Sequence, residues 1–431
     1  MANKLAVMLG AGNVGRGFLG QLFSESGYEV VFVDVDEPLI AALKARGGYT
    51  IRLVDADGAI RDSAEEVTVS PVWALHAREV DAVAGALAGA DIAATAVGVR
   101  ALPHIAPLVA AGVVRRAERR GERPAGGNPL NVIVCENMPD AAATFRRMVG
   151  AHVPEADQAY FLAHVGFVDT VIARMAPPPT PEMRARDPSL IMVEPYKELP
   201  VDGAAFVGRI PKIVGMEPCA NFGFYVARKL HIHNAGHALL GYLGYVRGHA
   251  FGYQALADGV IHLLLERAMT EAQAGIVHEY GADAVRLEAH VADLLRRFGN
   301  RALGDTVFRL ARDPLRKLGP RDRLVGAARL AEKAGVVPET LSWGIAGGYR
   351  FDSPEDPLAV ALQRRIAEEG FDAVIADVSG IAAEEPLGVL VRERYERLSA
   401  VRTWGCSLHP LGREKGAEVC DGALGGGVGV G

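Results

Sequence analysis

The stretch Lys4-Leu-Ala-Val-Met-Leu-Gly10-Ala-Gly-Asn-Val-Gly15 decides the fold of the N-terminal half. An apolar run at residues 5–9 leads into three glycines with the spacing GxGxxG, and a helix-like segment follows them until Gly27. A second apolar run at residues 30–33 ends in Asp34, 19 residues after Gly15. Strand, glycine turn, helix and strand in about thirty residues predict a βαβ unit of the Rossmann type.

Each part of this turn has a role in binding a dinucleotide. Gly10 permits the tight turn, Gly12 lets the backbone approach a pyrophosphate, and Gly15 lets the helix pack close to the strand. The free amides at the helix start and the positive end of the helix dipole favour phosphate groups. We therefore expect the cofactor to contact Gly10, Ala11, Gly12, Asn13, Val14 and Gly15. Asp34 can accept hydrogen bonds from a ribose diol and would repel a 2′-phosphate, which favours NAD over NADP.

Two further buried strands are expected to end at the same site. The run Ile92-Ala-Ala-Thr-Ala-Val-Gly98 ends at a glycine, and Val132-Ile-Val-Cys135 is followed by Glu136 and Asn137. Because the carboxyl ends of parallel strands face the ligand, we expect Val97, Gly98 and Asn137 near the cofactor. For Glu136 and Asn137, a role in anchoring the loop fits the sequence equally well.

The C-terminal half has a different periodicity. Strand-like runs nearly vanish after about residue 219, and helical patterns occupy residues 221–247, 253–279, 283–298, 321–335, 357–369 and 384–398. The fold class is therefore α/β, with an N-terminal Rossmann-type, mainly parallel sheet and a C-terminal all-α domain. We expect a nucleotide-binding domain at 1–200, a helical catalytic domain at 201–398 and a disordered, Gly-rich tail at 399–431. The Pro- and Gly-rich segment 175–215 is the expected crossover, with little regular structure.

The composition of the chain argues against nucleic-acid and membrane partners. The chain has 431 residues and a net charge of −6, which argues against a nucleic-acid partner because phosphate backbones need a basic face. No apolar stretch of about 18 residues is free of charge, and no charged leader precedes the first strand, so we expect a cytoplasmic protein without a membrane partner. The four cysteines form no CxxC pair. The lack of heptads permits a monomer or a weak homo-oligomer.

The run Lys229-Leu-His-Ile-His-Asn234-Ala-Gly-His237 carries candidate chemistry. In an α-helix, at about 100° per residue, Asn234 lies roughly 140° around from Lys229 and His237 falls between them. An alcohol oxidation needs a base, a donor to the developing alkoxide and a positioning group, which these three supply. A metal site is the alternative, because His233 and His237 are four apart and His231 is near. However, no HExxH pattern or clear third ligand accompanies them, and Lys229 would repel a cation, so we predict no metal.

The chain resembles the long-chain polyol-specific dehydrogenases of the mannitol dehydrogenase family, and within them those that act on mannitol 1-phosphate. The resemblance spans residues 1 to about 398 and is carried by seven motifs in shared order: Gly10-Ala-Gly-Asn-Val-Gly-Arg-Gly-Phe-Leu-Gly20, Cys135-Glu-Asn-Met138, His164-Val-Gly-Phe-Val-Asp169, Arg228-Lys-Leu230, Asn234-Ala-Gly-His237, Tyr242-Leu-Gly244 and Asp313-Pro-Leu-Arg-Lys-Leu318. It implies metal-independent, NAD-dependent interconversion of D-mannitol 1-phosphate and D-fructose 6-phosphate. By position, Lys229 is then the general base, Asn234 stabilises the alkoxide, and His237 helps to hold the substrate oxygen.

The resemblance also implies substrate contacts at Asp169 and Arg350, and Arg16 is a further candidate. A phosphorylated sugar needs at least one cation. The candidates are Arg16, Arg309, Arg316, Lys317, Arg323 and Arg350. Two alternatives stay open: the same chemistry on free mannitol, arabinitol or a hexuronate, and an NAD-binding sensor without turnover.

Overall fold

We examined a computed structural model of the chain, which describes residues 4–54, 66–119, 129–176 and 179–404. The first half is built on a six-stranded sheet in the order β5-β2-β1-β6-β7-β8, and all of its pairings are parallel. The strands are β1 (Lys4–Leu9), β2 (Tyr28–Asp34), β5 (Val72–His76), β6 (Ile92–Thr95), β7 (Leu130–Val134) and β8 (Val165–Asp169). The strand order reverses at β1, so the switch point that binds ligands in such sheets lies between β1 and β6. The predicted Rossmann-type sheet is confirmed.

Helices cover both faces of this sheet because its strands are apolar on both sides. One face packs on α3 (Val80–Gly89), α4 (Leu102–Glu118), α5 (Ala141–Gly150) and α6 (Glu155–His164). The other packs on η1 (Gly15–Gly20), α1 (Gln21–Glu25) and α2 (Glu37–Arg46). The first helix opens with one π-helical turn, η1, rather than with regular α-helix. A Cβ at Gly20 would lie 2.4 Å from the Tyr49 hydroxyl and 2.7 Å from the Phe32 ring, so glycine lets this turn pack closely.

The crossover segment holds more structure than its composition indicated. β9 (Ile191–Val193) joins β3 (Tyr49–Leu53) and β4 (Glu66–Val69) in a small sheet, in the order β4-β3-β9. β10 (Leu199–Asp202) pairs with β11 (Met216–Cys219), and α7 (Pro181–Arg186) precedes them. The apolar residues of β9 are buried against the face of the main sheet that also carries η1, α1 and α2. The proline and glycine content of the segment does not indicate this long-range packing.

The second half is helical, as predicted. Its elements are α8 (Phe222–Arg228), η5 (Lys229–Asn234), α9 (Ala235–Val246), α10 (Gly252–Ala257), α11 (Gly259–Tyr280), α12 (Ala284–Phe298), α13 (Val307–Ala311), α14 (Pro314–Lys317), α15 (Arg323–Lys333), α16 (Leu341–Tyr349), α17 (Pro357–Glu369), α18 (Phe371–Ser379) and α19 (Pro386–Trp404). α9 is buried on nearly every side and is the central helix of this unit. α19 runs past the expected boundary at 398, and the tail from residue 405 lies outside the described residues.

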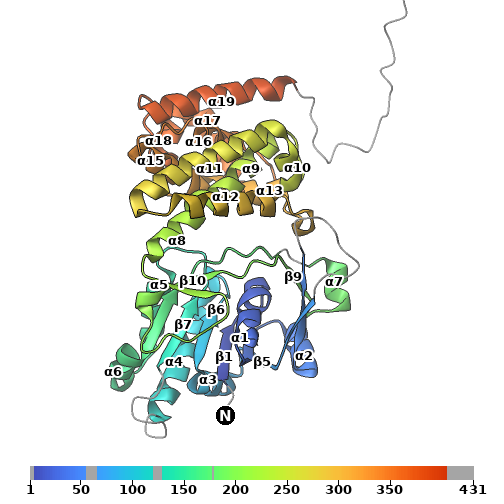
Figure 1. The fold of residues 1–431 in the computed structure, drawn as a ribbon, viewed down its shortest axis with the longest axis vertical. Helices are drawn as coiled ribbons and strands as arrows, with labels where there is room; N and C mark the ends of the chain where they lie inside the picture. The colour runs from blue at the N-terminus through green and yellow to red at the C-terminus, as the bar shows by residue number, and fades with distance from the viewer. Residues whose placement is uncertain (1–3, 55–65, 120–128, 177–178, 405–431) are drawn as a thin grey trace, which may run out of the picture.

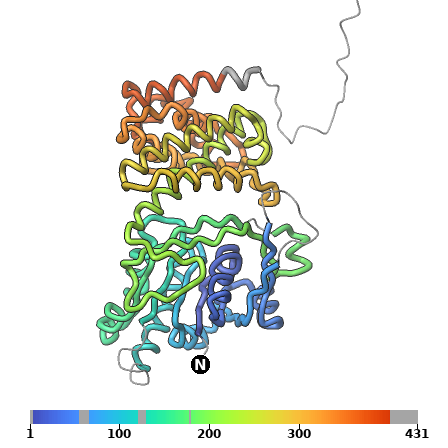
Figure 2. Tube along the Cα trace, viewed as in Figure 1, coloured from blue at the N-terminus to red at the C-terminus, as the bar shows by residue number. Residues whose placement is uncertain are grey.

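The helical unit stands on one end of the Rossmann sheet (Figure 1). The N-terminus lies at the far end of the sheet, so the parallel strands run towards the helical unit and end beneath it. Figure 2 shows the crossover, in green, running along the boundary before the chain rises into the helices. None of the helices within the described ranges combines the length and apolar character needed to span a membrane.

Candidate functional site

The glycine turn between β1 and η1 has the geometry that a dinucleotide site needs. Gly10 has φ of +100°, and a Cβ there would lie 2.5 Å from the carbonyl oxygen of Ala96. A Cβ at Gly15 would lie 2.0 Å from the carbonyl oxygen of Gly10, so only glycine lets the helix approach the turn. Gly12 is exposed, and no atom lies within 4 Å of where its Cβ would be. The backbone at Gly12 is therefore open to a phosphate group.

Asp34 lies beside this turn, at the carboxyl end of β2. Its Oδ2 accepts a hydrogen bond from the amide of Ala11 at 2.6 Å, and its Oδ1 accepts from Val35 at 2.7 Å. The carboxylate is only partly buried and has acceptor capacity left for a diol. Asn13 is turned to the crossover, where its side-chain amide donates to the carbonyl of Ala176 at 3.2 Å.

The ends of β6 and β7 are joined by a buried glutamate. Glu136 accepts hydrogen bonds from the Thr95 hydroxyl at 2.5 Å and from the Val97 amide at 3.0 Å. Burial raises the pKa of Glu136, and these hydrogen bonds oppose the rise. Glu136 is therefore a loop anchor, whereas Gly98 and Asn137 are exposed at the same edge of the sheet. Gly98 has φ of +86°, which favours glycine at this turn.

The run with the candidate catalytic residues differs from the regular helix that we expected. Residues Lys229–Asn234 form a π-helical turn, η5, between α8 and α9. A π-helix closes i→i+5 hydrogen bonds and so has a wider turn than an α-helix. Lys229 and Asn234, five residues apart, therefore lie closer to alignment along the axis than the 140° of an α-helix. The expected angle was wrong, but the change brings the amine and the amide nearer to one face.

Lys229 lies at the boundary between the two halves. Its pKa is lowered from 10.5 to about 8, chiefly by burial and also by the charge of Arg323, while Cys135 opposes the change. Because Cys135 interacts electrostatically with the amine and directly follows β7, the amine lies near the carboxyl end of that strand. The residue as a whole is partly exposed, and burial is the largest cause of the lowered pKa of its amine.

The amine of Lys229, the amide of Asn234 and the imidazole of His237 have no hydrogen-bond partner in the described part of the chain, and the Nδ1 atoms of His231 and His233 are also unpartnered. Polar groups that are even partly withdrawn from water normally find partners, so this set is prepared to bind a polar ligand. The ring of His237 stacks on Phe298, with centroids 4.0 Å apart and an interplanar angle of 27°. Burial and nearby cations lower the pKa of His237 well below its usual value, so the ring is neutral at pH 7.

The other two histidines of the run pack within the helical unit. His231 lies against α15, where a Cβ at Gly326 would be 2.5 Å from its Cε1, and burial lowers its pKa to about 4. His233 is buried with its ring edge-on to that of His237, at a centroid distance of 4.8 Å. No three His, Cys, Asp or Glu side chains within the described ranges come together as metal ligands.

Several basic side chains of the helical unit act electrostatically on His237. Its pKa is lowered, after burial, by the charges of Arg309, Arg297, Lys317 and Arg323. Lys317 donates to the carbonyl of Leu310 at 2.5 Å, and burial together with Arg323 and Arg316 lowers its pKa to about 7. Arg309 pairs with Asp305, and Arg323 pairs with Asp322 at 2.7 Å. We call Arg309, Lys317 and Arg323 the cation group.

Asp169 is the first of the three candidate substrate contacts. Asp169 ends β8 at the same edge of the sheet, where its Oδ1 accepts from the amide of Ala142 at 2.9 Å. Burial raises the pKa of Asp169, and Asp140 and Asp202 add to the rise.

Arg16 and Arg350, the other two candidate substrate contacts, both have hydrogen-bond partners within the protein. Arg16 is buried, and its guanidinium donates to the carbonyls of Ala11 at 2.6 Å and Ser189 at 2.5 Å. Arg350 lies over the ring of Tyr395 and donates to that residue's carbonyl at 2.9 Å, which ties α16 to α19. Both guanidinium groups are thus engaged by the protein, and we do not carry them into the proposed site.

Sequence reasoning missed three residues next to the site: Glu194, Arg297 and Phe298. The helical period of residues 283–298 marks Phe298 as a buried position, but no local pattern shows that its ring meets His237. Glu194 and Arg297 are charged residues far apart in the sequence, and nothing in the sequence connects them.

Comparison with known proteins places residues 4–215 and 221–399 in one family. The model of the mannitol dehydrogenase Rossmann domain matches residues 4–215, and that of the mannitol dehydrogenase C-terminal domain matches residues 221–399. The chain is 38% identical over 398 residues to a mannitol-1-phosphate 5-dehydrogenase of Geobacillus thermodenitrificans, with 91% of this chain and 98% of the relative covered. A protein of the same name from Brevibacillus brevis is 37% identical, with the same coverage.

Solved structures agree on the fold. A substrate-free D-sorbitol dehydrogenase matches with a TM-score of 0.74 at 16% identity, covering 93% of this chain and 97% of that one. The mannitol 2-dehydrogenase of Pseudomonas fluorescens, in complex with NAD and D-mannitol, matches with a TM-score of 0.66 at 17% identity, covering 93% and 94%. The chain therefore belongs to the mannitol dehydrogenase family and is an oxidoreductase of the polyol dehydrogenase type.

Proposed function

We propose that this protein is an NAD-dependent dehydrogenase that interconverts D-mannitol 1-phosphate and D-fructose 6-phosphate, with Lys229 as the general base. One observation carries the proposal: an amine with a pKa of about 8 lies near the carboxyl end of β7, on the same short run as an unpartnered amide and a neutral imidazole. The names of the relatives with 37–38% identity support the choice of substrate.

The nucleotide site is formed by the glycine turn and the neighbouring strand ends. Residues 10–15 would hold the pyrophosphate through backbone amides, and Asp34 would accept the ribose hydroxyls. Val97, Gly98 and Asn137 border the same edge. When bound, NAD supplies the hydride acceptor. The open backbone at Gly12 and the exposed Gly98 fit a group of this size and charge.

The three side chains then divide the proton chemistry. In oxidation, the neutral amine of Lys229 takes the proton of the substrate hydroxyl. The carbon that bears this hydroxyl loses a hydride, with its two electrons, to the nicotinamide and becomes a carbonyl. The amide of Asn234 donates to the oxygen as negative charge develops on it, and His237 holds that oxygen in place. In reduction, the ammonium of Lys229 returns the proton. Asp169, at the same edge, is proposed to contact the polyol chain.

The charges around the site favour a phosphorylated substrate. The cation group and Arg297 are four basic side chains whose charges act on His237, and Asp305, Asp322 and Glu194 pair with three of them. Charge-assisted hydrogen bonds to a phosphate are among the stronger polar interactions in proteins, particularly from an arginine. We propose Arg323 as the main phosphate contact because its charge also acts on Lys229.

One assay tests the substrate. Purified protein is given NADH with fructose 6-phosphate, fructose or a hexuronate, and absorbance at the nicotinamide band is followed. We expect turnover with fructose 6-phosphate. Turnover only with the unphosphorylated sugars would overturn the substrate assignment, and NADH binding without any turnover would favour the sensor.

A further inference from the structure

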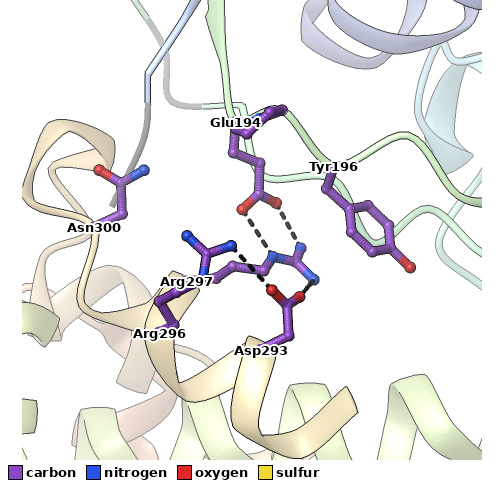
Figure 3. Close-up of a pocket in the computed structure, with 7 residues that line it drawn as sticks. Glu194, Tyr196, Asp293, Arg296, Arg297 and Asn300 are labelled. Carbon is purple, nitrogen blue, oxygen red and sulfur yellow. Dashed lines mark hydrogen bonds and ion pairs between the residues drawn. The ribbon is translucent and has the colours of Figure 1, made fainter. Parts of the chain in front are cut away.

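A buried ion pair joins the two halves of the protein close to the proposed site. Arg297, in the last turn of α12, donates through Nε to Oε2 of Glu194 at 2.8 Å and through Nη2 to Oε1 at 2.5 Å. The Arg297 and Glu194 side chains are only 4% and 2% exposed. Figure 3 shows the two groups facing each other, the glutamate from the crossover and the arginine from the helical unit. A two-point contact of this kind fixes orientation as well as distance.

The glutamate is held firmly on the Rossmann side. Its Oε1 also accepts from the amide of Met175 at 2.6 Å, and its backbone carbonyl accepts from Nε of Arg174 at 2.6 Å. Arg297 in turn donates to the carbonyl of Ala173 at 2.6 Å and lies over the ring of Tyr196 at 4.1 Å. The end of α12 is therefore fixed to the crossover by several short contacts.

The residue after Arg297 transmits this constraint to the site. Phe298 is buried, and its ring stacks on that of His237 at 4.0 Å. The edge of His233 closes another side of the same imidazole. A Cβ at Gly236 would lie 3.1 Å from Cε2 of Phe298, so this position leaves room for the ring. The orientation of His237 thus depends on where the end of α12 lies.

We propose that Glu194 and Arg297 are positioning residues, which set the orientation of His237 towards the substrate oxygen through Phe298. The inference rests on the proposed function of His237. A cavity of about 220 Å³ adjoins the pair, lined also by Asp293 and Asn300, so the contact is not enforced by close packing on every side. The ion pair is the two-point part of this constraint, and the contacts of Arg297 to Ala173 and Tyr196 add to it.

Arg297→Lys tests this idea because lysine keeps the charge and loses the two-point contact. We expect kcat for fructose 6-phosphate reduction to fall about tenfold to a hundredfold, since small displacements of a positioned group have effects of this size, and the Kd for NADH to stay unchanged. Glu194→Gln should behave alike. Arg296→Lys is the matched control, because that neighbouring side chain is half exposed and pairs with Asp293 at 3.0 Å.

A double-mutant cycle separates positioning from general structure. If the pair acts through His237, Arg297→Lys should change kcat less than about twofold in a His237→Ala background, because the interaction is already lost. An equal loss of kcat in both backgrounds would overturn the proposal.

A spectroscopic readout does not depend on turnover. The stacked Phe298 ring should shift the Hε1 resonance of His237 upfield in a histidine-labelled sample, with the resonance assigned by His237→Gln. Arg297→Lys should move it downfield, and Phe298→Leu should move it in the same direction. An unmoved resonance in Arg297→Lys would refute the positioning role. Absence of turnover by the wild type with every sugar would refute the proposed function instead.

Discussion

Replacement of Lys229 by alanine should remove nearly all polyol oxidation while leaving nucleotide binding intact. With a pKa of about 8, about one amine in ten is neutral at pH 7, whereas with a pKa of 10.5 the fraction is about 300-fold smaller. A positioned general base typically contributes about 10²- to 10⁴-fold to the rate. We therefore expect kcat for mannitol 1-phosphate oxidation to fall by that factor, with an unchanged Kd for NADH.

The pH dependence follows from the same shift. The base acts in its neutral form, so the rate of oxidation should rise about tenfold per pH unit below pH 8 and level off above it. Reduction needs the ammonium, so its rate should fall as pH rises through about 8. Lys229→Arg should be as defective in oxidation as the alanine variant, because a guanidinium stays protonated.

Steady-state kinetics at the nicotinamide band, together with NADH fluorescence titration, measure both quantities. Lys212→Ala is the control, since Lys212 is an exposed lysine of the crossover. If Lys229→Ala retained more than about a tenth of the activity, or lost nucleotide affinity in proportion to rate, Lys229 would not be the base.

Three further substitutions test other parts of the account. Asp34→Ala should weaken NAD binding about tenfold to a hundredfold, as expected for loss of charge-assisted hydrogen bonds, and NADP binding much less; an unchanged preference by isothermal titration would remove Asp34 from the ribose site. Arg323→Gln should raise KM for fructose 6-phosphate about tenfold or more and leave KM for fructose unchanged; equal effects on both would exclude phosphate recognition. Gly241→Ala should lower the free energy of unfolding by about 1–3 kcal/mol, because its Cβ would lie 2.7 Å from that of Leu310. Gly259→Ala, with open space around its Cβ, is the control in the same thermal melts.

The strand, glycine turn and helix at the N-terminus could be predicted because their determinants are local. Gly10 and Gly15 are required by the turn itself, whereas Gly12 has open space around it. The strand end at Asp34 followed from the apolar run before it, and β6 ends at Thr95, three residues before the predicted end at Gly98. Such features depend on a few neighbouring residues, so a single sequence carries them.

The rest depends on contacts between distant segments. The guanidinium of Arg16 donates to the carbonyl of Ser189, which is 173 residues away in the sequence. The guanidinium of Arg350 donates to the carbonyl of Tyr395. The π-helical turn at Lys229 has no marker in the sequence of the run. The partners Glu194 and Arg297 are 103 residues apart. No periodicity links residues at such separations, so tertiary structure was needed to find them.

Direct titration of the Lys229 amine tests the central claim most closely. Lysines labelled by reductive ¹³C-methylation would be followed by NMR across pH 6–11 in the intact protein, with the Lys229 signal assigned by its loss in Lys229→Arg. We predict a midpoint near pH 8 for this signal, while exposed lysines titrate at about 10.4. A Lys229 midpoint at the value of the exposed lysines would contradict the account.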